Sequence, residues 1–113
     1  MVYTQVFKDK ILDYIKERIS TSELGEDGTP PTVDDTSLGD PVSGTIRDVQ
    51  VVKANSVLGI SASRFNTDPA SAYREIGLFD LDGDLILRVS HATINTTVTD
   101  NTRIRYNMRV FFE

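Results

Sequence analysis

The sequence predicts a mainly β fold: an antiparallel β-sandwich or jelly-roll-like domain with one N-terminal amphipathic helix. Three observations support this class. Apolar residues recur every four positions near the start, side chains alternate strictly at the end, and short apolar runs with turn signals lie between. The 113 residues fit one structural domain. We expect it to consist of a helix over 1–20, a Gly/Pro-rich connecting arm over 21–44 and an antiparallel β domain over 45–113.

The N-terminal helix is predicted by apolar side chains at helical spacing: Phe7, Ile11, Ile15 and Ile19. Residues 3–19 contain no Gly or Pro, and Thr4 is suited to cap the helix start. Three acidic side chains form a ridge on the opposite side: Asp9, Asp13 and Glu17. A solvated helix face is one interpretation of this acidic ridge, and a docking site for a basic surface is the other.

The arm is predicted by its composition. Residues 20–44 contain four glycines and three of the four prolines, and the Pro30–Pro31 pair excludes regular helix. An ordered polar segment of this length needs anchors, and we expect Leu38 and Val42 to provide them.

The remainder has the pattern of short strands. Segments 45–53 and 56–65 are expected to pair around Ala54–Asn55, a loop follows over 66–72, and further strands are expected over 73–79, 85–92 and 93–99. Asp100–Asn101 is the next expected turn. In the last segment one face is apolar: Ile104, Tyr106, Met108, Val110 and Phe112. The opposite face is polar: Arg103, Arg105, Asn107, Arg109 and Glu113.

Three alternating aspartates, Asp80, Asp82 and Asp84, indicate either a calcium loop or a hairpin tip. A calcium loop of the EF-hand type needs Gly at its sixth position and Glu at its twelfth. Counted from Asp80, those positions hold Leu85 and His91, so the sequence favours a hairpin, with a weak surface calcium site as the alternative.

The hairpin is predicted to turn at Asp82-Gly83 in a type I′ conformation, in which both residues have positive φ. This turn sets the expected opposing pairs: Leu81–Asp84, Asp80–Leu85, Phe79–Ile86, Leu78–Leu87 and Ile76–Val89. The pairing places one apolar set on a single face: Ile76, Leu78, Leu85, Leu87 and Val89. Glu75 and Arg88 fall on the other face, close enough to interact. Gly77 leaves a gap in this strand, and Arg88 is expected to lie across it.

Composition excludes several functions. The net charge of −5 argues against a nucleic-acid partner, and no apolar run approaches the length of about 18 residues needed to span a membrane. The N-terminus does not have the pattern of a signal peptide. With no cysteine and the single histidine His91, the chain offers neither a thiol site nor a set of zinc ligands. We therefore expect no enzyme activity, no catalytic residues, no cofactor and no metal. A hydrolase using paired carboxylates is the weakest alternative.

The final strand carries a basic strip of Arg103, Arg105 and Arg109. One interpretation is a solvated sheet face. The other is a contact with the acidic ridge of a neighbouring subunit, because the charges are opposite and both sets recur periodically.

The order of segments resembles a known family. "TPPTVDDTSLGDPV" (29–42) precedes two strands, "REIGLFDLDGDLILR" (74–88) and an alternating final strand. This order is similar to small structural proteins of tailed phages, of the tail-fibre, baseplate or collar type, and its most specific part is "REIGLFD" (74–80).

The resemblance implies a β-sandwich-like fold and a non-enzymatic role in the virion, after synthesis in the host cytoplasm. It implies other virion proteins as partners and a homo-oligomer, as a trimer or higher ring. The N-terminal helix and the absence of a fibrous shaft favour a compact adaptor or decoration subunit. The alternative is a β module that binds a host receptor or glycan, with calcium at the three aspartates assisting.

Overall fold

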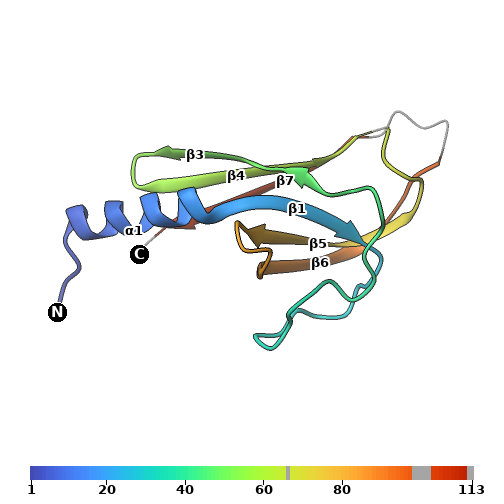
Figure 1. Ribbon diagram of the computed structural model, residues 1–113, viewed down its shortest axis with the longest axis horizontal. Coiled ribbons are helices and arrows are strands. Elements are labelled where there is room, and N and C mark those ends of the chain that lie inside the picture. The colour runs from blue at the N-terminus through green and yellow to red at the C-terminus, as the bar shows by residue number, and fades with distance from the viewer. Residues whose placement is uncertain (66, 98–102, 112–113) are drawn as a thin grey trace.

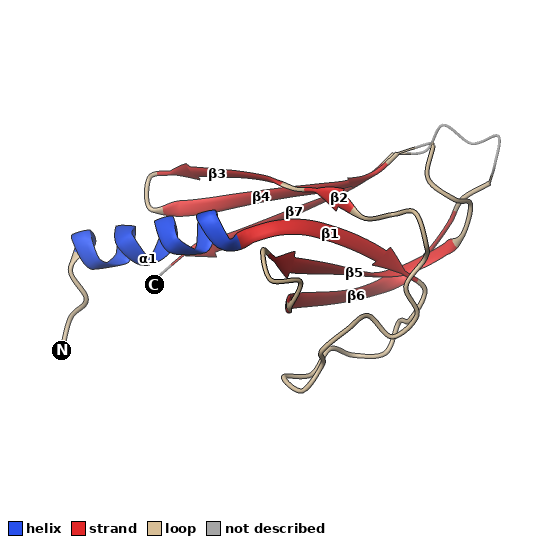
Figure 2. Ribbon diagram, viewed as in Figure 1, coloured by secondary structure: helices blue, strands red, loops and turns tan. Residues whose placement is uncertain are grey.

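The computed structural model describes residues 1–65, 67–97 and 103–111. In this part of the chain one helix leads into two antiparallel sheets that pack face to face (Figures 1 and 2). The molecule is elongated, with extents of 52 × 29 × 25 Å. The predicted mainly β, sandwich-like class is confirmed. The predicted turn at Asp100–Asn101 and the inward position of Phe112 lie outside the described residues.

One sheet, called sheet A here, contains in spatial order β2 (Arg47–Asp48), β1 (Ile19–Gly25), β5 (Ala72–Asp80) and β6 (Leu85–Asn95). The other, called sheet B, contains β3 (Gln50–Ala54), β4 (Val57–Arg64) and β7 (Ile104–Phe111). All neighbouring strands are antiparallel.

The helix α1 (Gln5–Arg18) forms where its apolar spacing predicts. The Thr4 hydroxyl oxygen accepts a hydrogen bond from the Phe7 N–H at 3.3 Å, so Thr4 is the N-cap. Leu12 is fully buried, and Ile15 packs against a core cluster that includes Ile60. The helix therefore docks on the sandwich through one face.

The boundary between helix and arm differs from the prediction. Ile19 has φ −68° and ψ 128°, so the backbone becomes extended immediately after α1 and continues as β1. The first residues assigned to the arm thus form a strand between β2 and β5. This strand was not predicted, because the sequence around Thr21 and Ser22 is polar and its apolar pattern is weak. Hydrogen bonds to β2 and β5 on its two sides stabilise the strand conformation instead. The irregular arm is shorter than predicted, and it runs over residues 26–44 apart from a single bridge between Gly25 and Pro41.

The core lies between the sheets in two clusters. The larger contains Leu24, Ala62, Tyr73, Ile76 and Ile104. The smaller lies near α1 and contains Ile19, Ile60 and Leu78. The described inward side chains of β7 pack against these clusters, which confirms the predicted alternation of that strand.

The predicted strand over 45–53 is divided at Val49. β2 belongs to sheet A and β3 to sheet B, and Val49 packs against both core clusters where the chain crosses between the sheets. The pairing with β4 follows as expected around a tight turn. Asn55 and Ser56 both have positive φ, 51° and 66°, the pattern of a type I′ turn.

The β5–β6 hairpin forms, but its turn differs from the prediction. Gly83 has φ 82°, whereas Asp82 does not have positive φ, so the type I′ assignment is wrong. Instead Leu81–Asp84 connect the strands, with the Asp80 N–H donating to the Asp84 carbonyl at 3.0 Å. The Asp80 carboxylate explains the longer turn, since it accepts from the Asp82 N–H at 2.9 Å and the Asp84 N–H at 3.0 Å.

The longer turn changes the register near the tip. Leu78 opposes Leu87 and Ile76 opposes Val89, as predicted. Phe79 opposes Leu85, however, so the predicted Leu81–Asp84, Asp80–Leu85 and Phe79–Ile86 pairs are wrong. The shift moves Leu85 away from the predicted apolar face. Its Cδ1 lies 2.9 Å from where a Cβ at Gly77 would be, on the outer side of the sheet.

Candidate functional site

A buried ion pair holds the arm against sheet A. Glu75 is 0% exposed, and its carboxylate accepts from the N–H groups of Asp27 (2.8 Å), Asp40 (2.9 Å) and Gly39 (3.0 Å). Arg88 Nε donates to the same carboxylate at 2.9 Å, so the predicted Glu75–Arg88 contact is confirmed. A buried carboxylate is stable only with such partners. One side chain therefore fixes both ends of the arm.

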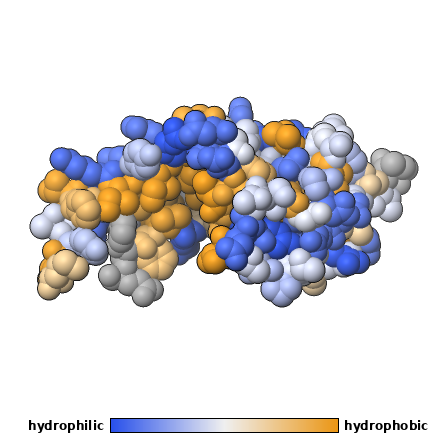
Figure 3. Space-filling model, turned by 60° about the horizontal axis from the view of Figure 1, so that its bottom comes forward, coloured by the Kyte–Doolittle hydropathy of each residue, from blue (hydrophilic) through white to orange (hydrophobic). Residues whose placement is uncertain are grey.

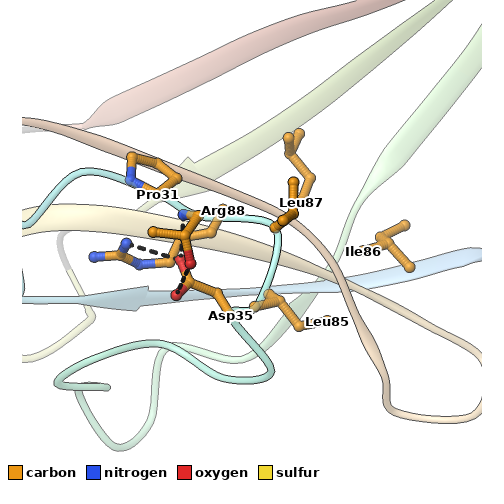
Figure 4. Close-up of a pocket in the computed structure, with 8 residues that line it drawn as sticks. Pro31, Asp35, Leu85, Ile86, Leu87 and Arg88 are labelled. Carbon is orange, nitrogen blue, oxygen red and sulfur yellow. Dashed lines mark hydrogen bonds and ion pairs between the residues drawn. The ribbon is translucent and has the colours of Figure 1, made fainter.

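Arg88 extends this network to the middle of the arm (Figure 4). Its Nη1 contacts Asp35 Oδ2 at 3.2 Å, and its Nη2 donates to the Asp27 carbonyl at 3.1 Å. The hydrogen bond to Glu75 raises the pKa of Arg88. The Thr32 N–H lowers the pKa of Asp35 in the same way that the Thr29 N–H lowers that of Asp27. Both arm carboxylates are thus held in their charged form.

Leu38 is the apolar anchor of the arm. It is 4% exposed, and its Cδ2 lies 2.7 Å from where a Cβ at Gly77 would be. Leu38, and not Arg88 as predicted, therefore occupies the space left by Gly77. Val42 also packs against the core, so both predicted anchors are confirmed. Beside the arm a cavity of about 480 Å³ opens between Pro31–Val33 and the start of β6 (Figure 4).

The three hairpin aspartates come together, and two of them contact an arginine. One carboxylate oxygen from each of Asp80, Asp82 and Asp84 lies within 4.8 Å of the others. Arg18 Nη2 is bonded to Asp82 and lies 3.5 Å from Asp80 Oδ2, and the Asp84 N–H holds the pKa of Asp80 below its ordinary value. Calcium requires six to eight oxygen ligands. Here a guanidinium already takes the cation's place, which sequence reasoning missed because Arg18 is distant in the chain.

Two residues of the acidic ridge contact a lysine of the same chain. Lys53 Nζ lies 2.9 Å from Asp13 Oδ1 and 3.9 Å from Asp9 Oδ1, so β3 supplies a basic partner for two of the three residues. Glu17 makes no ion pair within the described ranges and is exposed. The contacts of Asp9 and Asp13 with Lys53 thus help to hold α1 against the sandwich.

The basic strip is divided between two places on the outer face of sheet B. Arg103 lies over the Phe65 ring at 4.5 Å, and Arg47 lies over the same ring at 4.3 Å. Arg105 joins these two arginines around a hollow of about 350 Å³, whereas Arg109 lines a separate hollow nearer α1. Between the described residues no ion pair links the strip to the acidic ridge. The contributions of Arg47 and Phe65 were not foreseen, because they come from other segments.

His91 connects the two sheets. Its Nε2 lies 2.8 Å from the Tyr106 hydroxyl, and burial raises the pKa of Tyr106 to about 12. His91 lies on β6, the last strand of sheet A.

An apolar surface covers the end of the molecule that carries α1 (Figure 3). On the helix and just before it, three exposed aromatic residues form what we call the aromatic stripe: Tyr3 (52% exposed), Phe7 (47%) and Tyr14 (64%). The Tyr3 and Phe7 rings stack with centroids 5.4 Å apart. The stripe was not identified from the sequence, because the same helix also buries Leu12 and the apolar spacing does not show which side chains are covered.

Next to the stripe lies a hollow of about 530 Å³, called the apolar groove here. It is enclosed by α1, the β5–β6 tip and the end of β7. Its apolar lining consists of Tyr14, Ile15, Ile19, Ile60, Leu78, Ile86, Leu87 and Val110, and Arg18, Asp80 and Asp82 provide its charges. Ile86 (46% exposed) and Leu87 are accessible to a partner.

Comparison of the chain with protein-family models, with curated proteins and with solved structures finds no match. Within the described ranges, no helix combines the length and the apolar character needed to cross a bilayer.

Proposed function

We propose that this protein is a structural subunit of a virion, acting in the tail, baseplate or collar or as a decoration protein. It acts through contacts with other virion proteins and with further copies of itself, and it performs no catalysis. The observation that supports this proposal best is the aromatic stripe lying directly beside the apolar groove.

The stripe and groove have the character of a protein contact. Contiguous apolar surface is uncommon on monomeric proteins, and exposed aromatic side chains are typical anchors of interfaces. On the face that Figure 3 shows, the apolar atoms gather toward the α1 end. The buried Glu75–Arg88 network keeps the arm in one conformation. Such preorganisation lowers the entropy lost when a subunit is incorporated into an assembly.

The test is incorporation into particles. Purified particles should contain the wild-type protein in a fixed copy number, measured by quantitative mass spectrometry. Phe7→Lys should reduce that number at least tenfold, because it places a charge in the stripe. Val52→Lys is the matched control, since Val52 is also apolar and 63% exposed but lies on the outer face of sheet B. Absence of the wild-type protein from particles, or equal incorporation of both variants, would contradict the proposal.

A second candidate function is the binding of an acidic glycan, which the hollow formed by Arg47, Arg103 and Arg105 favours. Guanidinium groups bind carboxylates in a defined geometry. The ion pair with Asp68 holds the Arg47 guanidinium in place. Calorimetry with a sialylated oligosaccharide tests this candidate. Arg105→Glu should abolish binding and Arg109→Glu should not.

A further inference from the structure

We infer that the partner of the stripe and groove is a second copy of this chain, bound with the two α1 helices antiparallel about a two-fold axis. The inference rests on the proposed function, since it names the partner of the same surface. It differs from the trimer or ring that the family resemblance implies.

One molecule carries two apolar surfaces of complementary shape. The first turns of α1 and the residues before them extend past the ends of the sheets (Figure 1), where Tyr3, Val6 and Phe7 are exposed. The groove beside the last turns of α1 is concave and lined largely by apolar side chains. An apolar helix in an apolar groove is a common recognition mode. The chain therefore carries both halves of such a contact, at opposite ends of one helix.

The helix positions fit one antiparallel register. At about 100° per residue, Phe7, Tyr14 and Arg18 fall within about 40° of one another on the helix, and Tyr3 stacks on Phe7 just before the helix begins. A two-fold axis between residues 10 and 11 places Phe7 opposite Tyr14 of the second copy. The same axis places Tyr3 opposite Arg18, a favourable pairing of an aromatic ring with a cation. Both helix starts and both grooves are then occupied, which closes the dimer.

The charges also favour this arrangement. The first half of α1 carries Lys8 and Lys10 against one acid, Asp9, whereas the groove lining carries Asp80 and Asp82 against one base, Arg18. Antiparallel helices bring the more basic first half of each helix to the more acidic groove of the other copy. A parallel arrangement would instead place like charges together.

The first measurement is sedimentation velocity over a range of concentrations. We expect wild type to form a species of twice 12.6 kDa. Phe7→Glu and Leu87→Glu should each weaken the dimer at least tenfold, while Val52→Glu should leave its affinity unchanged. Both target side chains are exposed, so neither change should unfold the chain. A wild-type protein that stays monomeric, or forms a trimer, would overturn the inference.

Cysteine cross-linking tests the helix arrangement, and the cysteine-free sequence gives a clean background. Phe7→Cys and Tyr14→Cys proteins are oxidised separately and as a mixture. The mixture should give disulfide-linked dimers much faster than either protein alone. Self-linkage of Phe7→Cys at the same rate as the mixture, or no linkage in a dimeric sample, would refute the antiparallel register. A different result would separate the two proposals. If the wild-type protein is monomeric and Phe7→Lys is still lost from particles, the proposed function is supported and the partner is another protein.

Discussion

Glu75→Gln tests how the arm is held. The Glu75 carboxylate accepts four hydrogen bonds, three from arm N–H groups and one from Arg88. Glutamine keeps one acceptor oxygen and turns an NH₂ group toward donors, so about two of the four bonds are lost. Hydrogen bonds to a charged group contribute about 1.5–3 kcal/mol each, which gives a loss of about 3–6 kcal/mol. Much of the stability of an ordinary domain, about 5–15 kcal/mol, would then be removed.

Two assays measure this loss. Urea unfolding followed by circular dichroism gives the global change. A protease that cuts before aspartate reports release of the arm, where it has four target sites: Asp27, Asp34, Asp35 and Asp40. Glu23→Gln on the neighbouring strand is the control, since desolvation and the charge of Glu75 raise the pKa of Glu23. Removing that charge should leave stability unchanged or slightly higher. If Glu75→Gln keeps the wild-type unfolding free energy and arm protection, the buried network does not hold the arm.

Three further outcomes are expected. Backbone N–H groups lower the pKa of three aspartates below the ordinary 3.8: Asp27, Asp35 and Asp80. Their contribution to stability is present above that value and is lost as the pH falls through the lowered values, so urea midpoints should fall between pH 4 and pH 2. Gly77→Val should cost about 1–3 kcal/mol by displacing Leu38, measured by thermal unfolding, and an unchanged midpoint would contradict this packing. Millimolar calcium should not shift the melting temperature, because Arg18 already pairs with the tip carboxylates, and a shift abolished by Asp82→Asn would reverse that conclusion.

The predictable parts of the fold are those set by local pattern. The helix follows from its apolar spacing and from Thr4, and β7 from its alternation. The Glu75–Arg88 contact follows from the pairing of Ile76 with Val89. Strand β1 does not follow, because the Ser and Thr residues around Ser22 gain their strand conformation from neighbours distant in sequence.

A side chain that binds backbone N–H groups explains why the predicted hairpin turn was wrong. The Asp80 carboxylate binds two N–H groups and so favours a longer turn than Asp82-Gly83 alone would adopt. The candidate contact surface was missed for a different reason. The groove combines Ile15, Ile60 and Leu87, which no sequence window contains together.

The most direct test of the proposed assembly role is photo-crosslinking from α1 inside assembled particles. Tyr14 is replaced by a benzophenone-bearing phenylalanine, and Val52 is replaced in the same way as a control. We expect position 14 to give a covalent product with a virion protein, or with a second copy of this chain, and position 52 to give much less. Particles in which position 14 yields no protein product, while position 52 does, would contradict the assignment of the stripe and groove as the contact surface.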